Sequence, residues 1–353
     1  MTAPGKLDGV ALVTGGTGGL GRAVVSELLD AGATVVTTWL VERERESIEQ
    51  ELGSRDGLHL VEANLLEDGG PQQVARAATD WCAQRGDCLY VGSAPDREHD
   101  TSKPRPRTAH GYTDTVSAYV RTIVEYAAPL QAAKVYGALY APWVMVPDPG
   151  GPGPAATRVV PADGHVLGVY ARTELERGIA KAPAGDAAVL RGVLGTVADL
   201  TQEQHTDLVR TGLTNGLLTA RGRGTTVAAS RTLSSDTRWS FVNVRLLFNF
   251  VKATLRDGLR YVRQEPHTGE LRRSLVTNVV TPFLLGLWRQ GAFGSDPPED
   301  VFTVKCDAEN NPPAQVDQGL LQLEVYFYAA RPAETIRILV GQRSSGAGSA
   351  TES

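Results

Sequence analysis

An alternation of strand-like and helix-like segments between residues 10 and 64 constrains the fold more than any other feature of the sequence. Valine and leucine are dense in three short runs, VALVT, ATVVTTW and LHLVEAN, and two helical stretches, GRAVVSELLDAG and ERERESIEQELGS, separate these runs. Strands that are covered on both faces have this apolar character, and helical crossovers between such strands make them parallel. The sequence therefore predicts a Rossmann-like β-α-β-α-β unit, which is half of a doubly wound α/β sheet.

The sequence after residue 66 predicts a second, larger region of mixed helices and strands. Helical apolar spacing marks 67–84, 113–134, 239–265 and 272–293, and apolar runs mark strands at 87–95, 136–146, 302–307, 320–330 and 334–341. Two stretches that are polar or rich in proline and glycine, 96–111 and 147–164, are typical of exposed loops. The small polar residues of 344–353 predict a disordered tail.

The composition excludes several classes of function. The 353 residues carry 35 Lys and Arg against 40 Asp and Glu, a net charge of −5, so the chain has no general attraction to nucleic acid or anionic lipid. Its three cysteines fit neither a disulfide framework nor a zinc spacing. No apolar run reaches the roughly 18 residues of a membrane span, and the N-terminus has no signal-peptide core. We expect assembly in the cytoplasm, with no metal, no nucleic acid and no direct membrane insertion.

A glycine-rich loop, TGGTGGLG at residues 14–21, lies between the first predicted strand and the first predicted helix. Glycine permits the tight turn there and lets the backbone approach a pyrophosphate, which helix N–H groups can then bind. The order of the glycines, the β-α-β pattern after them and the asparagine after the third strand resemble the nucleotide-binding start of the short-chain dehydrogenase/reductase family. This resemblance covers residues 7–66.

The dehydrogenase resemblance implies a set of cofactor-binding residues. It places Gly15, Gly19 and Gly21 in the phosphate loop and Asn64 near the adenine ring, with NAD or NADP as the cofactor. The residues after the second strand, Trp39-Leu40-Val41, include neither the early acid typical of NAD selection nor an early base for NADP. The choice between the two cofactors therefore stays open.

The catalytic half of the dehydrogenase family is missing from the sequence. Its chemistry uses a tyrosine and a lysine four residues later on one helix face, where the ammonium lowers the pKa of the phenol. None of the 10 tyrosines has a lysine at that spacing. We therefore expect no catalytic residues, no hydride transfer and no enzyme activity. We expect no cofactor and a purely structural use of the β-α-β unit; a vestigial or regulatory site for NAD or NADP stays open as the alternative.

From about residue 80 to residue 343 the sequence resembles a different family, the contractile tail sheath proteins of phages and extracellular contractile injection systems. The resemblance rests on the order and spacing of four blocks, YGALYAPWVMVPDP (136–149), VPADGHVLGVYARTELERGIAKAPAG (160–185), GRGTTVAASRTLSSDTRWSFVNVRLLFNFVK (222–252) and FTVKCDAENNPP (302–313). Four separated blocks are far more specific than one glycine loop. The chain is therefore divided into a Rossmann-like unit at 1–75, a sheath-like α+β core with a C-terminal strand arm at 76–343, and the tail.

The sheath resemblance implies a structural and polymerising role. In that family, terminal strands join sheets of neighbouring subunits, and heterologous contacts between identical subunits build a tube. The implied partners are other copies of the chain in stacked hexameric rings, an inner tube protein, and baseplate and cap proteins. The implied function is contraction that drives the inner tube through a target envelope, as part of a phage tail-like particle. The alternative is an NAD(P)-dependent oxidoreductase, and a third hypothesis is a sheath subunit with a nucleotide-binding segment.

Other clusters of reactive residue types have simpler structural explanations. Glu174 and Glu176 stand two residues apart, so they do not share a helix face as an acid pair would. Asp236 follows two serines, but no histidine is close in sequence, which favours a turn that caps a helix. His165 is a lone histidine in a predicted turn. The oxygen-rich stretch 306–313 lacks the calcium-loop spacing, and the sheath resemblance implies a structural corner there.

Overall fold

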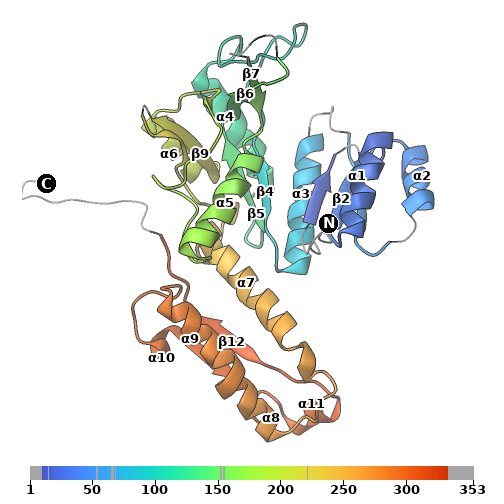
Figure 1. The fold of residues 1–353 in the computed structure, drawn as a ribbon, viewed down its shortest axis with the longest axis vertical. Helices are drawn as coiled ribbons and strands as arrows, with labels where there is room; N and C mark the ends of the chain where they lie inside the picture. The colour runs from blue at the N-terminus through green and yellow to red at the C-terminus, as the bar shows by residue number, and fades with distance from the viewer. Residues whose placement is uncertain are drawn as a thin grey trace, which may run out of the picture.

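The computed structural model describes residues 10–332, except 15, 53, 54, 65, 66, 68, 152, 154, 155 and 221. Figure 1 shows three bodies: an N-terminal unit in blue, a central body from cyan to yellow, and a terminal body in orange and red. The N-terminal unit lies beside the central body, and the long helix α7 leads from the central body into the terminal one. The predicted strand 334–341 and the predicted disordered tail 344–353 lie outside the described residues.

The N-terminal unit is a parallel three-stranded sheet in the order β1-β2-β3. Its elements are β1 (Val10–Val13), α1 (Gly19–Asp30), β2 (Thr34–Trp39), α2 (Glu42–Leu52) and β3 (Leu58–Glu62). Val25, Val35, Ile48 and Leu52 form its apolar core, so both helices pack onto the sheet through their apolar faces. The predicted β-α-β-α-β unit is confirmed.

Helix α3 (Gly70–Arg85) joins the N-terminal unit to the central body. One face of α3 packs into the central body, where Ala75 belongs to a buried cluster with Leu139 and Leu233. On the other side, Trp81 Nε1 donates a hydrogen bond of 2.9 Å to His59 Nε2 on β3. The expected division between residues 75 and 76 falls inside this helix, which is shared by both bodies.

The central body is built on a four-stranded sheet in the order β10-β9-β5-β4. Strands β4 (Tyr90–Ser93), β5 (Gly137–Ala141) and β9 (Thr214–Ala220) run parallel, and β10 (Gly224–Val227) is antiparallel to β9. Helices α4 (Val116–Ala127), α5 (Asp163–Arg177) and α6 (Gln202–Arg210), with the short turn η1 (Ala128–Leu130), surround the sheet. Tyr140 on β5 is buried and Tyr170 on α5 is half-buried, and their hydroxyls lie 2.5 Å apart.

Three of the sequence expectations for the central body were wrong. The single strand expected at 136–146 is two strands in different sheets, because Pro142 has no N–H to continue the ladder after β5. Residues 144–147 form β6, which pairs with β7 (Thr157–Val160) and β8 (Gly195–Thr196). The loop expected at 147–164 therefore contains β7, whose short TRVV run is hidden by the prolines and glycines around it. His165 lies in α5 and not in a turn.

The terminal body packs helices against a two-stranded antiparallel sheet. It contains α7 (Val242–Gly258), α8 (Gly269–Ser274), the π-helical turn η4 (Leu275–Val280), α9 (Thr281–Arg289), α10 (Pro298–Val301), β11 (Phe302–Lys305), α11 (Pro313–Asp317) and β12 (Glu324–Phe327). The short turns η2 (Thr237–Trp239) and η3 (Arg260–Val262) flank α7. Pro282 lies in the first turn of α9, directly after the π-helical turn η4, so the local widening of the helix coincides with the residue that has no N–H to donate. Helical backbone continues from 269 to 289 through the π-helical turn η4.

Candidate functional site

The glycine-rich loop leads into the N-terminus of α1. Gly15 lies outside the described residues, Gly19 is the first residue of α1, and Gly21 lies in its first turn. The N-cap residue is Gly18, so no side chain accepts from the first N–H groups, and the first turn carries no acidic residue. An uncapped helix N-terminus that follows a parallel strand can bind a phosphate.

Close packing fixes the loop against β2. A Cβ atom added to Gly16 would lie 2.0 Å from Thr37 Oγ1, so only glycine fits there without a shift of its neighbours. Thr37 Oγ1 in turn donates a hydrogen bond of 2.6 Å to the carbonyl oxygen of Val13 on β1. On the outer side, Thr17 Oγ1 donates to Glu44 Oε2 at 3.1 Å. The loop conformation is therefore set by glycine and by side chains of β2 and α2.

The remaining predicted cofactor residue, Asn64, follows the end of β3 and donates from Nδ2 to Glu67 Oε1 at 2.8 Å. Because β1, β2 and β3 are parallel, Asn64 and the glycine loop lie at the same edge of the sheet. A doubly wound sheet continues beyond β1 and binds a dinucleotide across that switch point. Here β4 pairs with β5, and sheet β1-β2-β3 has no further strand among the described residues. The phosphate part of a dinucleotide site therefore fits this unit, whereas the wall for the second nucleotide is lacking.

The second candidate site is the terminal sheet of β11 and β12. Tyr328 N donates to the Val301 carbonyl at 2.8 Å, and the strand pairs run from Phe302 opposite Phe327 to Lys305 opposite Glu324. Hydrogen-bonded and non-hydrogen-bonded pairs alternate in an antiparallel ladder. The N–H group of Val325 therefore points away from β11, toward an edge with which no described strand pairs. Open edges of this kind can accept a strand from another chain.

An aromatic cluster fixes the terminal sheet against the helices. The ring of Phe327 stacks on Phe248 of α7 at 4.1 Å between centroids, and Phe293 lies 5.1 Å from Phe327. The opposite face of β12 is open, with Tyr326 63% exposed. One face of the sheet is thus anchored in the body, while the other face and the outer edges are accessible.

Asn311 forms the corner that leads into β12. Its side chain is 2% exposed, its Nδ2 donates to the carbonyl of Gln322 at 2.9 Å, and its Oδ1 accepts from Gln322 N at 2.7 Å. Asp307 accepts from the backbone N of Glu309 at 2.8 Å in the same loop. These side chains serve hydrogen bonds of the backbone, as expected for a structural corner. Within 10–332, outside the gaps in the description, no group of three or more His, Cys, Asp or Glu is placed to hold a metal ion.

The other charged residues singled out from the sequence lie apart from one another. Glu174 and Glu176 are on the last turns of α5. Asp236 caps η2 by accepting from Arg238 N at 2.9 Å, and the hydrogen bonds from Arg238 lower the pKa of its carboxyl. Sequence reasoning missed Arg245, a 2% exposed arginine held between the rings of Tyr136 and Trp239 at 3.9 and 4.1 Å. The sequence feature that could have revealed Arg245 is a charged residue among the apolar residues of the helix that starts at 242.

Comparison with known proteins separates the two parts of the chain. A model of the short chain dehydrogenase family matches residues 9–100. A 3-oxoacyl-(acyl-carrier-protein) reductase of Aquifex aeolicus is 41% identical over 66 residues, which are 18% of this chain and 27% of the reductase. A prophage major tail sheath protein of Pseudomonas aeruginosa is 27% identical over 182 residues, 51% of this chain and 45% of the relative.

Solved structures extend the second match over most of the chain. The sheath of an extracellular contractile injection system, PVC, in its contracted state matches with a TM-score of 0.62 and 26% identity, over 85% of this chain and 74% of the sheath chain. The chain is similar in sequence and fold to contractile sheath proteins. A chain of the anti-feeding prophage baseplate has the same fold at 24% identity and a TM-score of 0.61, over 85% of this chain and 72% of its own length.

The chain thus combines a sheath-like fold with a dehydrogenase-like N-terminal unit, as the two sequence resemblances predicted. It spans less than half the length of the curated sheath relative that it matches. No helix in the described part of the chain is long and apolar enough to cross a membrane.

Proposed function

We propose that the chain is a structural subunit of a contractile sheath, which polymerises around an inner tube and contracts to drive the tube through a target envelope. The observation that carries this proposal is the structural match to a contracted sheath over 85% of the chain. The homology indicates a structural role, and we propose further that the protein is not an enzyme. No tyrosine in the sequence has the lysine partner that dehydrogenase chemistry uses.

The terminal sheet supplies a physical means of linking subunits. A terminal strand of a neighbouring copy would add to an open edge of β11 or β12 through main-chain hydrogen bonds. Such a contact joins different surfaces of identical chains, so its repetition gives rings where the rotation closes and helices where it does not. We propose hexameric rings stacked into a helical tube, assembled in the cytoplasm of the producing bacterium together with an inner tube protein, baseplate and cap proteins.

The separate cores of the chain suit a subunit that moves while it stays linked. The terminal body has its own buried cluster, which includes Leu247, Leu284 and Phe293, and the central body has another around Tyr140 and Leu217. Because each body is packed around its own core, a strand link on the terminal sheet can persist while the central bodies of neighbouring copies slide. Contraction needs links of this kind.

Paired substitutions at the sheet edges test the strand-link proposal. Val325→Pro removes an N–H that points to the open edge of β12, whereas Val325→Ala removes the same packing and keeps the N–H. Val304, opposite Val325 on β11, offers the same pair of variants for the other edge. We expect at least one proline variant to stop tube formation in negative-stain images and sedimentation, while both alanine variants form tubes. Tubes from both proline variants would rule out strand addition at this sheet.

We also propose that the N-terminal unit binds the phosphates of NAD or NADP, through Gly15, Gly19 and Gly21, with Asn64 near the adenine ring. Support comes from the reductase similarity of 41% and from the uncapped start of α1. Titration of the purified protein with NADH or NADPH, followed by calorimetry, should show saturable binding. Gly19→Asp places a carboxylate at the start of α1 and should abolish it. Absence of binding at about millimolar cofactor would remove this proposal and leave the sheath proposal untouched.

A further inference from the structure

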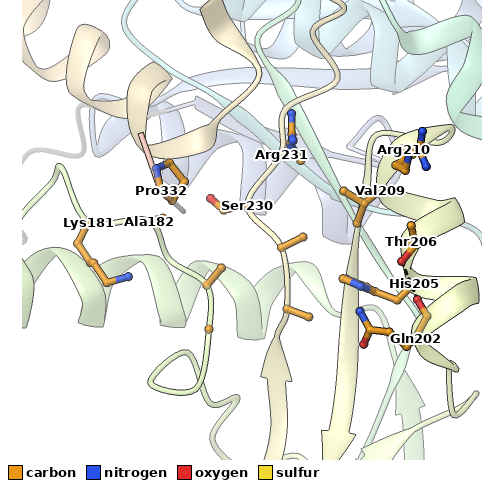
Figure 2. Close-up of a pocket in the computed structure, with 14 residues that line it drawn as sticks. Lys181, Ala182, Gln202, His205, Thr206, Val209, Arg210, Ser230, Arg231 and Pro332 are labelled. Carbon is orange, nitrogen blue, oxygen red and sulfur yellow. Dashed lines mark hydrogen bonds between the residues drawn. The ribbon is translucent and has the colours of Figure 1, made fainter. Parts of the chain in front are cut away.

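Figure 2 shows a cavity of about 460 Å³ in the central body, between α6 and the segment that leads from β10 into α7. Pro332, at which the described chain ends, lies at its rim. Arg231 and His205 line the cavity, and each of them has an interaction partner, so neither side chain requires a ligand there. A pair of cysteines at the end of α3, Cys82 and Cys88, offers more specific chemistry.

Cys82 and Cys88 flank the turn that joins α3 to β4. Cys82 lies in the last turn of α3 and is buried, whereas Cys88 lies two residues before β4 and is half-buried. Between them, Gly86 has a φ of 74° in the left-handed region, and its N–H donates to the carbonyl oxygen of Cys82 at 2.8 Å. This glycine cap ends the helix and changes the direction of the chain. The two thiols consequently share a hydrogen bond.

The hydrogen bond makes the two thiols chemically unequal. Cys82 donates to the sulfur of Cys88, which lowers the pKa of the Cys88 thiol. The same hydrogen bond and burial raise the pKa of Cys82. The thiolate is the reactive form of cysteine, and Cys88 is also the more accessible of the two. Cys88 is therefore suited to react first, with Cys82 held beside it as the second thiol.

The turn that carries Cys88 is fixed to the long helix α7. Asn249 Nδ2 donates to the carbonyl oxygen of Cys88 at 2.9 Å, and Arg256 Nη1 lies 2.6 Å from Asp87 Oδ2 in an ion pair. Asn249 and Arg256 are seven residues apart, so they lie on one face of the helix. Because α3 is shared with the N-terminal unit and α7 leads into the terminal body, this turn connects all three bodies (Figure 1).

We propose that Cys82 and Cys88 form a reversible disulfide when the protein meets a peroxide, so that this turn is a redox-sensitive joint between the bodies. The Cys88 thiolate attacks one oxygen of hydrogen peroxide, the O–O bond breaks, and Cys88 becomes a sulfenic acid while hydroxide leaves. The sulfur of Cys82 then attacks that of Cys88, and its proton leaves with the hydroxyl as water. In sum, two thiols and one peroxide give one disulfide and two waters. In a reducing compartment the pair stays as thiols, and the proposal does not depend on the sheath function.

Treatment of the purified, reduced full chain with hydrogen peroxide tests the proposal, with alkylation and mass spectrometry to follow each thiol. We expect a loss of about 2 Da, the mass of two hydrogens, and a peptide map that links Cys82 to Cys88. Cys306 is buried and its pKa is raised, so its thiol should be lost about tenfold more slowly. A dithiol reductant should restore the pair. Hydrogen exchange at 83–88 should slow about threefold or more in the oxidised chain, because the crosslink restricts local opening.

Two alanine variants separate the reacting pair from the third cysteine. Cys82→Ala should stop at a sulfenic acid on Cys88, which dimedone traps, whereas the control Cys306→Ala should form the disulfide at the rate of the original chain. Survival of both thiols at peroxide concentrations that oxidise free cysteine would overturn the proposal. So would a disulfide that appears only in unfolding concentrations of urea, equally fast pairing with Cys306, or unchanged exchange at 83–88 after the link has formed.

Discussion

Replacement of Asn311 by alanine should loosen the terminal sheet. The side chain holds Gln322 through two hydrogen bonds of 2.9 and 2.7 Å and donates to the carbonyl of Asp307 at 3.1 Å. At about 1 kcal/mol net for each bond the loss would be about 3 kcal/mol. Gln322 is itself exposed, so water can replace part of what it loses, and we expect a cost of about 2 kcal/mol.

Hydrogen exchange followed by mass spectrometry measures the loss of local stability separately for each helix and strand. A local cost of about 2 kcal/mol corresponds to roughly thirtyfold faster exchange of the amides in β12, with β5 in the central body unchanged. Asn278→Ala is the matched control, because this asparagine is exposed on η4 in the same body and its Nδ2 donates to Ser274 Oγ at 3.1 Å. Exchange of β12 that changes less than about threefold, or equal acceleration in β5, would refute the corner role of Asn311.

Three further predictions concern the packing of the N-terminal and central bodies. Gly16→Ala, whose Cβ would meet Thr37 at 2.0 Å, should destabilise the N-terminal unit by about 1–3 kcal/mol and raise its sensitivity to limited proteolysis. Burial lowers the pKa of His59, so the stability from its contact with Trp81 is present above about pH 6.5 and is lost as the pH falls through the lowered pKa. Trp81→Phe should reduce this pH dependence of the unfolding free energy in denaturant titrations. Burial raises the pKa of Tyr126 to about 12, so stability should fall as the pH rises above about 10, and Tyr126→Phe should reduce that fall.

The elements that depend on local pattern could be predicted from the sequence. The β-α-β-α-β unit follows from apolar runs and helical spacing, and α7 from its single apolar stripe. The break between β5 and β6 depended on one residue, Pro142, inside an otherwise continuous apolar run. The partner of β4 could not be predicted, because its residues suit either sheet and only the packing of α3 against the central body decides between them.

The candidate sites also differ in whether local sequence reveals them. The glycine loop is contiguous in sequence, so its residue types alone revealed it, whereas the corner at 306–313 was implied by the sheath resemblance. The open edge of the terminal sheet depends on the pairing of β11 with β12, and no local pattern shows which N–H groups point outward. Arg245 was not singled out from the sequence, because its place between two aromatic rings depends on the tertiary fold.

Cryo-electron microscopy of the chain produced together with a candidate inner tube protein tests the central claim most directly. The account predicts hollow helical tubes in which every terminal sheet of β11 and β12 is extended by a strand from another copy. Monomers at every concentration, with no tubes in the presence of the tube protein, would contradict it.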